Sequence, residues 1–122
     1  MGVDLVDIRR FAAVIDRTPG LVARVFTDRE IEASGAHRKQ VVSLAGRWAV
    51  KEAVAKVLVD TTGLSWHDCE VLSGERGEPR IVVSGTVAEA ASVRGIERWL
   101  VSVSHDGDMA MAFVIAGAGE RG

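Results

Sequence analysis

Four charged residues, Arg47, Lys51, Glu52 and Lys56, stand close together in a segment that is otherwise rich in alanine and valine. The composition of this segment predicts one long helix over residues 38–59. On a helical wheel its apolar residues cover both sides, so charges in it are costly unless they are paired, ligated to an ion or facing a cleft. From the pattern alone, an ion pair between Glu52 and Lys56 in the favourable i to i+4 order is the preferred explanation.

Asp4 is a second carboxylate in apolar surroundings, inside a run over residues 2–6 that is typical of a strand. Two carboxylates without a Cys/His cluster make a poor zinc site. They suit Mg²⁺, which takes one or two carboxylates, keeps several waters and completes its shell with substrate phosphates. Asp4 and Glu52 are therefore candidate metal ligands, although the sequence alone does not put one beside the other.

The remaining charged and polar candidates indicate phosphate binding. Arg47 and Lys51 are about 40° apart on the predicted helix, and no acid stands at the matching spacing. A phosphate explains such a pair well, and projection of both cations into water is the alternative. His105 ends a predicted strand, where a histidine is more often structural than functional. The turn Gly77–Pro79 allows a backbone to approach a ligand closely, but it is equally compatible with a plain turn.

The elements that must position these residues predict an α+β fold in one domain, residues 1–122, with a mainly antiparallel sheet packed against the long helix. The order is β-helices-ββ-α-ββ. The expected elements are a strand over 2–6, a helix capped by Asp7 and ending near Asp16, a helix over 21–26, a short helix opened by the capping box Thr27-x-x-Glu30, the long helix over 38–59, strands over 68–72 and 80–83, a helix from the capping box Thr86-x-x-Glu89 to Arg94, and strands over 98–104 and 109–116. The last strand is apolar on both faces, so we expect a helix on one face and another subunit on the other.

Composition excludes several classes of function. The net charge of −2 gives no support to nucleic-acid binding. No run approaches the ~18 apolar residues of a membrane span, so a membrane is not an expected partner either. The first residues lack a signal-peptide pattern, and the single cysteine, Cys69, excludes an internal disulfide. A cytoplasmic location is the default expectation. Closely spaced arginines from Arg9 to Arg29 form either an ordinary solvated face or a surface for an acidic partner.

Taken together, these stretches resemble the holo-acyl-carrier-protein synthases over essentially the whole chain. The matching stretches are Gly2–Ile8 with Arg10 and Phe11, Val25-Phe26-Thr27-x-x-Glu30, Leu44-Ala45-Gly46-Arg47-Trp48-Ala49-Val50-Lys51-Glu52-Ala53-x-x-Lys56, Gly77-x-Pro79-Arg80-Ile81 and Val101-Ser102-Val103-Ser104-His105. The helix motif with its upstream aspartate is the specific part. After that helix the family often has a Gly-Thr-Gly loop, which this chain replaces with residues 58–64.

The resemblance implies 4′-phosphopantetheinyl transfer. Enzymes of this family move the phosphopantetheine arm of coenzyme A onto a serine of a carrier protein and release 3′,5′-ADP. On that pattern Asp4 and Glu52 hold Mg²⁺ on the coenzyme A diphosphate, and Lys56 approaches the same phosphates. These three are the expected catalytic residues, and either Glu52 or a water on the metal takes the serine proton. Such a reaction requires charge neutralisation and alignment more than covalent catalysis.

The resemblance also implies two sets of binding residues. Arg47, His105 and the Gly77–Pro79 turn are expected to hold the adenosine of coenzyme A and its 3′-phosphate. Arg10 and Arg17 are expected to meet the acidic helix of an apo acyl carrier protein from fatty acid, polyketide or related biosynthesis. The family is typically a homotrimer with active sites at subunit interfaces, so self-association is expected.

Two alternatives to the transferase stay open at this point. The first is a non-catalytic trimer that binds coenzyme A or a carrier without transferring anything. The second is an unrelated α+β domain in which Glu52 and Lys56 only stabilise the fold, and whose melting temperature coenzyme A would not raise.

Overall fold

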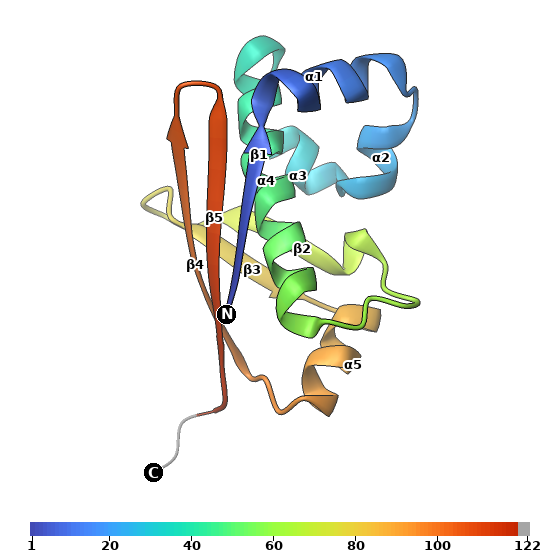
Figure 1. Ribbon diagram of the computed structural model, residues 1–122, viewed down its shortest axis with the longest axis vertical. Coiled ribbons are helices and arrows are strands. Elements are labelled where there is room, and N and C mark those ends of the chain that lie inside the picture. The colour runs from blue at the N-terminus through green and yellow to red at the C-terminus, as the bar shows by residue number, and fades with distance from the viewer. Residues whose placement is uncertain (120–122) are drawn as a thin grey trace.

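The long helix α4, His37–Leu58, is the element around which the others are arranged (Figure 1). The computed structural model describes residues 1–119. Its elements are β1 (Gly2–Asp7), α1 (Ile8–Arg17), α2 (Leu21–Val25), α3 (Asp28–Ala33), α4, the 3₁₀ helix η1 (Trp66–Asp68), β2 (Cys69–Ser73), β3 (Pro79–Val83), α5 (Gly85–Val93), β4 (Arg98–Asp106) and β5 (Met109–Gly117). The predicted order of elements is confirmed. No helix within the described residues combines the length and apolar character that a membrane crossing requires.

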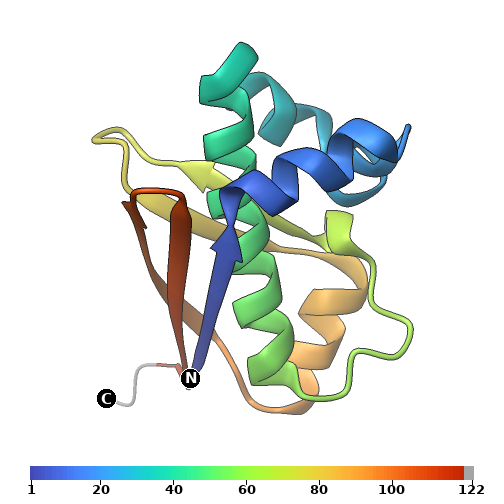
Figure 2. The same ribbon diagram turned by 45° about the horizontal axis from the view of Figure 1, so that its top comes forward.

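The strands form two antiparallel units, which confirms the α+β class and its antiparallel sheet. β1, β5 and β4 make one sheet in that spatial order, and β2 pairs with β3. In the larger sheet Asp4 of β1 lies opposite Ala112 of β5, which lies opposite Val103 of β4. Figure 2 shows this sheet on one side of α4 and helix α5 on the other, with α1 to α3 gathered at one end.

Small residues let α4 lie directly against the sheet. Ala53 of the helix and both Ala110 and Ala112 of β5 have no exposed surface. Gly2 acts in the same way at the start of β1, because a Cβ atom there would overlap the carbonyl of Ala53. The close contact fixes the height of Asp4 along the helix.

Short-range hydrogen bonds begin the first helices where the sequence predicted them. The carboxylate of Asp7 accepts a hydrogen bond from the N–H of Arg10 at 3.1 Å and caps α1. Thr27 and Glu30 form both hydrogen bonds of the predicted capping box at the start of α3. The chain therefore enters α1 and α3 at defined points.

The second predicted capping box, at Thr86 and Glu89, is wrong. Helix α5 begins at Gly85, and its N-cap residue Ser84 makes no side-chain cap hydrogen bond. The N–H and hydroxyl of Thr86 both donate to Oδ2 of Asp68, at 2.8 and 2.7 Å. The first turn of α5 is thus bound by a carboxylate from another element, and a Cβ atom on Gly85 would lie 2.5 Å from it.

Helix α4 ends in a strained turn. Val59 has φ of 65° and ψ of −62°, and the N–H of Asp60 donates to the carbonyl of Leu58 at 2.7 Å. This is the γ-turn with positive φ, which is rare and unfavourable for a β-branched residue. The turn opens the loop in which the sequence departs from the Gly-Thr-Gly pattern.

The sheet exposes one apolar face. Seven large apolar side chains with 36–63 % of their surface exposed lie on it, and we call them the outer face: Val3, Leu5, Leu100, Met109, Met111, Phe113 and Ile115. The opposite face of β5 is buried under α4, as predicted.

Candidate functional site

Asp4, Glu52 and Lys56 meet where β1 crosses α4. Asp4 faces the helix because β1 alternates buried and exposed residues, with Val3 and Leu5 pointing outward. The ammonium of Lys56 lies 2.8 Å from Oδ1 of Asp4 and 2.9 Å from the carbonyl oxygen of Val3. The ion pair that the pattern favoured between Glu52 and Lys56 is therefore replaced, because β1 offers the ammonium two acceptors at once.

The carboxyl group of Glu52 has a pKa above its ordinary value. Burial raises the pKa of its carboxyl group. The negative charge of Asp4 and hydrogen bonding with that residue raise this pKa further, and Lys56 opposes the shift. Oδ2 of Asp4 is buried and has no hydrogen-bond partner among the described residues. Two neighbouring carboxyl groups, one of them with a free buried oxygen, make an environment that a cation would relieve.

This donor set fits Mg²⁺. Within residues 1–119 no group of three or more His, Cys, Asp or Glu side chains is arranged to hold a metal. Asp4 and Glu52 alone would leave most of the coordination shell to water and phosphate oxygens, as Mg²⁺ prefers. The structure thus brings together the two residues that the sequence suggested as ligands.

The residues predicted to hold the adenosine of coenzyme A line a groove of about 220 Å³. Arg47 comes to it from α4, His105 from β4, and the Gly77–Pro79 turn from the β2–β3 connection. Gly46 makes room for the imidazole, because a Cβ atom there would lie 3.1 Å from Nε2 of His105. Residues from three distant parts of the sequence therefore share one groove.

Arg47 is a fixed wall of that groove. Its Nε donates to the carbonyl of Val71 at 2.8 Å, and its Nη1 donates to the hydroxyl of Ser43. Burial lowers the pKa of its guanidinium group, and the charge of Glu30 opposes that shift. The two hydrogen bonds hold the guanidinium plane in one orientation before any ligand arrives.

Lys51 neither projects into water nor is free to bind a phosphate of coenzyme A, as its pairing with Arg47 predicted. Its side chain has no exposed surface, and its ammonium pairs with Glu30 of α3 at 2.9 Å. It also donates to the carbonyls of Trp66 at 2.9 Å and of Cys69. The acidic partner of Lys51 is therefore Glu30, which lies on another helix and not at helical spacing along α4. From the sequence, Glu30 was predicted only as part of a capping box.

A second groove, of about 260 Å³ and mostly apolar, lies beside Glu52. It is formed by side chains of β1, α1 and α2 together with Trp48, and Arg10 lines it. Arg17 stands in the last turn of α1, is exposed and does not line the groove. Of the two arginines predicted to meet a carrier, Arg10 therefore lies in the groove beside Glu52 and Arg17 lies outside it.

Comparison with known proteins identifies the class. Residues 1–114 match the family model described as the 4′-phosphopantetheinyl transferase superfamily. The chain belongs to this superfamily.

Its similar proteins are holo-[acyl-carrier-protein] synthases. The sequence is 48 % identical over 116 residues to the enzyme of that name from Salinispora arenicola, covering 95 % of each chain. It is 48 % identical over 119 residues to the one from Kocuria rhizophila, covering 98 % of this chain and 92 % of the relative. The structure matches that of Helicobacter pylori holo-[acyl-carrier-protein] synthase in complex with coenzyme A with a TM-score of 0.82 and 28 % identity, over 95 % of this chain and 98 % of the other. The family resemblance inferred from the motifs is confirmed.

Proposed function

We propose that this protein transfers the 4′-phosphopantetheine group of coenzyme A to a serine of an apo acyl carrier protein and releases 3′,5′-ADP. The observation that carries the proposal is the cluster of Asp4, Glu52 and Lys56, which combines two carboxylates for a metal with an ammonium for a phosphate. Membership in the superfamily and relatives named holo-[acyl-carrier-protein] synthase support the same reaction. The carrier would serve fatty acid or polyketide biosynthesis.

Asp4 and Glu52 would hold Mg²⁺. The buried Oδ2 of Asp4 and the raised pKa of Glu52 support a cation at this point. When bound, the metal supplies charge neutralisation for the diphosphate of coenzyme A and lowers the pKa of its water. The metal would also favour the charged form of both carboxyl groups.

The side chains of the cluster would share the work of the transfer. The serine oxygen forms a bond to the phosphorus of the phosphopantetheine, and the bond from that phosphorus to the bridging oxygen breaks. Lys56, held beside the phosphates by Val3 and Asp4, neutralises the charge that develops on the departing 3′,5′-ADP. Either Glu52, in its carboxylate form, or a water at the site would accept the proton of the serine hydroxyl.

The two grooves would bind the two substrates. Arg47, His105 and the Gly77–Pro79 turn would hold the adenosine and its 3′-phosphate, since an arginine in fixed orientation suits a phosphate. The apolar groove beside Glu52, with Arg10 in its wall, would receive the carrier, whose acidic helix would meet Arg10 and, further along α1, Arg17.

Self-association as a homotrimer is part of the proposal. The outer face is a continuous apolar surface on three strands, which differs from the single exposed apolar residues of ordinary surfaces. Burying it against other subunits would place them against β1, the strand that carries Asp4 on its other face. A cytoplasmic location stays a prediction.

The first experiment is the intact mass of an apo acyl carrier protein after incubation with this protein, coenzyme A and Mg²⁺. The expected result is the gain of one phosphopantetheine, abolished by EDTA and by Asp4→Asn or Glu52→Gln. Glu89→Gln, an exposed glutamate of α5, is the matched control and should leave the gain unchanged. A folded wild-type protein that binds coenzyme A but modifies none of several carriers would instead establish a non-catalytic binding protein.

A further inference from the structure

The buried ion pair of Glu30 and Lys51 has no part in the mechanism above, although Lys51 directly precedes Glu52. Neither side chain of the pair is exposed, and Nζ of Lys51 lies 2.9 Å from Oε1 of Glu30. With the carbonyls of Trp66 and Cys69, the ammonium has an acceptor for each of its three protons.

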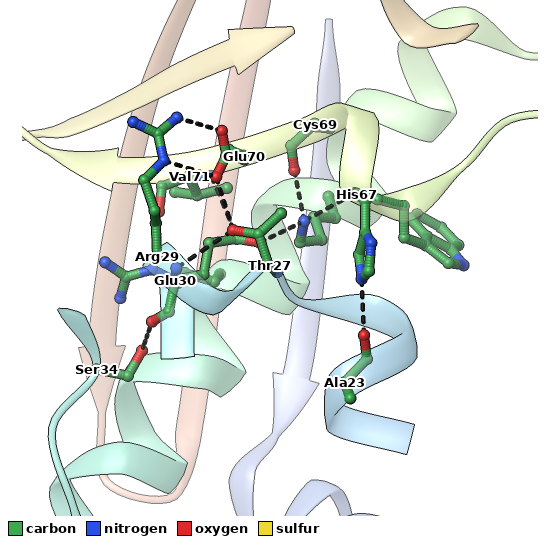
Figure 3. A network of polar contacts seen from close by, with 12 residues as sticks. Ala23, Thr27, Arg29, Glu30, Ser34, His67, Cys69, Glu70 and Val71 are labelled. Atoms are coloured by element: carbon green, nitrogen blue, oxygen red, sulfur yellow. Dashed lines mark hydrogen bonds and ion pairs between the residues drawn. The ribbon is translucent and has the colours of Figure 1, made fainter. Parts of the chain in front are cut away.

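Glu30 links this ammonium to strand β2 (Figure 3). Its Oε1 also accepts from the N–H of Thr27 at 3.0 Å, and its Oε2 accepts from the N–H of Val71 at 2.9 Å. The carbonyl of the same Val71 accepts from Nε of Arg47 at 2.8 Å. The contacts therefore form a ring through Lys51, Glu30, Val71 and Arg47. The ring begins and ends on α4, where Arg47 precedes Lys51 by one helical turn.

Apolar packing alone defines the rotation of α4 poorly. Its buried residues lie on both sides of the helix, and half of them are the small residues alanine and valine. Its N-cap residue, Ala36, makes no side-chain cap hydrogen bond. The ring adds directional, charge-assisted contacts at two points one turn apart, and these fix both the rotation of α4 and its height against β2.

We propose that Glu30 and Lys51 are positioning residues for the transfer reaction. The ring holds Arg47 in the coenzyme A groove and Glu52 beside Asp4 in one fixed spatial relation. The inference rests on the proposed function, because it concerns the alignment of that site. Stability alone does not explain the pair, since uncharged residues of similar volume often replace a buried ion pair without loss of stability.

The double variant Glu30→Gln/Lys51→Met tests this directly. It removes both charges and keeps an acceptor for the N–H of Val71. The carbonyls of Trp66 and Cys69 lose their donor in this variant, so we expect a melting temperature somewhat below that of the parent, whereas Lys51→Met alone also leaves a buried charge unpaired and should melt lower still. The dissociation constant for coenzyme A should rise, and kcat should fall, each by about tenfold or more, because a shift of about 1 Å in a reacting group has effects of this order. Parent-like values of both in the folded double variant would overturn the inference.

Glu30→Asp is a second variant that keeps both charges and withdraws the carboxylate by one methylene. It is expected to fold, to lower kcat by at least about threefold, and to speed hydrogen exchange at the N–H of Val71. Faster exchange at Val71 with unchanged kcat and unchanged coenzyme A affinity would mean that the ring does not position the site.

Glu70→Gln is the matched control, because Glu70 of β2 joins this strand to α3, as Glu30 does, at a partly exposed position outside the ring. Its carboxylate accepts from Thr27 at 2.7 Å and pairs with Arg29. We expect a lower melting temperature with unchanged kcat and coenzyme A affinity. If the parent itself neither binds coenzyme A nor modifies a carrier, the proposed function has failed. If the parent is active and the double variant equals it, only the positioning inference has failed.

Discussion

Lys56 is paired with Asp4 and not with Glu52, its neighbour on the helix, and its Nζ lies 2.8 Å from Oδ1 of that carboxylate. The lysine side chain is 56 % exposed, whereas the aspartate side chain is 9 % exposed. The ammonium thus reaches the carboxylate from the solvent side, where a phosphate would arrive, and Oδ2 stays buried. On the proposed mechanism, one carboxylate serves the lysine and the metal together.

Lys56→Met is expected to bind Mg²⁺ more tightly and yet to transfer more slowly. The ammonium repels a cation at the same carboxylate, so its removal should raise Mg²⁺ affinity severalfold. The transfer rate should fall by about 10²-fold, because the phosphates lose a fixed positive charge. Calorimetric titration with Mg²⁺ and single-turnover transfer measure the two effects. Lys39→Met, at an exposed position of α4, should change neither, and a loss of Mg²⁺ affinity in Lys56→Met would contradict the shared carboxylate.

The stability of the metal-free protein should depend on Glu52 in a defined pH window. Burial and Asp4 raise the pKa of Glu52 in the folded state, so the folded protein holds this proton more tightly than the unfolded chain. Stability therefore falls as pH rises from the unfolded value of about 4.3 through the raised folded pKa. Glu52→Gln lacks this charge and should melt higher than the parent at neutral pH in EDTA.

Calorimetry across this range, in EDTA and then in Mg²⁺, is the measurement. The melting temperatures of Glu52→Gln and the parent should converge below the window, and Mg²⁺ at neutral pH should stabilise the parent selectively. A difference that is constant with pH would contradict the pKa assignment.

Val59→Gly is expected to raise the free energy of unfolding by about 1 kcal/mol. Glycine adopts positive φ without the steric cost that valine carries, and this gain exceeds the extra chain entropy of glycine. Val93→Gly is a close control, because Val93 is 81 % exposed and Val59 79 %, but Val93 ends a helix at negative φ. Urea denaturation should show the control destabilised, and destabilisation of both variants would argue against strain at Val59.

Met111→Glu should prevent self-association. Met111 lies on the outer face and is 42 % exposed in the single chain, so a charge there would be buried without a partner in an assembly. Val82→Glu places the same charge on β3 at a residue that is 40 % exposed and outside this face. Light scattering should give a smaller particle for Met111→Glu alone, and equal masses for all three proteins would remove the outer face as the interface.

The sequence predicted well what is determined within one element. The bounds of α4 differ from the prediction by one residue at each end, because a segment rich in helix-forming residues, with no Gly or Pro after Gly46, is a local property. The caps at Asp7 and Thr27 were also predictable, since each bond spans three positions.

Contacts between distant elements were not predictable from spacing. Lys56 had a visible partner in Glu52, but Asp4, separated from it by 52 positions, is the residue it binds. Lys51 had no visible acid, because Glu30 reaches it from another helix. Thr86 likewise left its expected cap for Asp68, 18 positions earlier. In each case the partner comes from another element, which spacing along one helix does not reveal.

Because buried and exposed residues alternate along β1, the register of this strand determines whether Asp4 faces the site. Asp4 faces α4, and its neighbours Val3 and Leu5 belong to the outer face. Inserting or deleting one residue within the strand would exchange the two faces, so that the carboxylate would point to the exposed surface and valine or leucine toward the helix. Evolution can therefore lengthen or shorten the segment between Asp4 and α1 only in steps of two residues, unless a bulge absorbs the change.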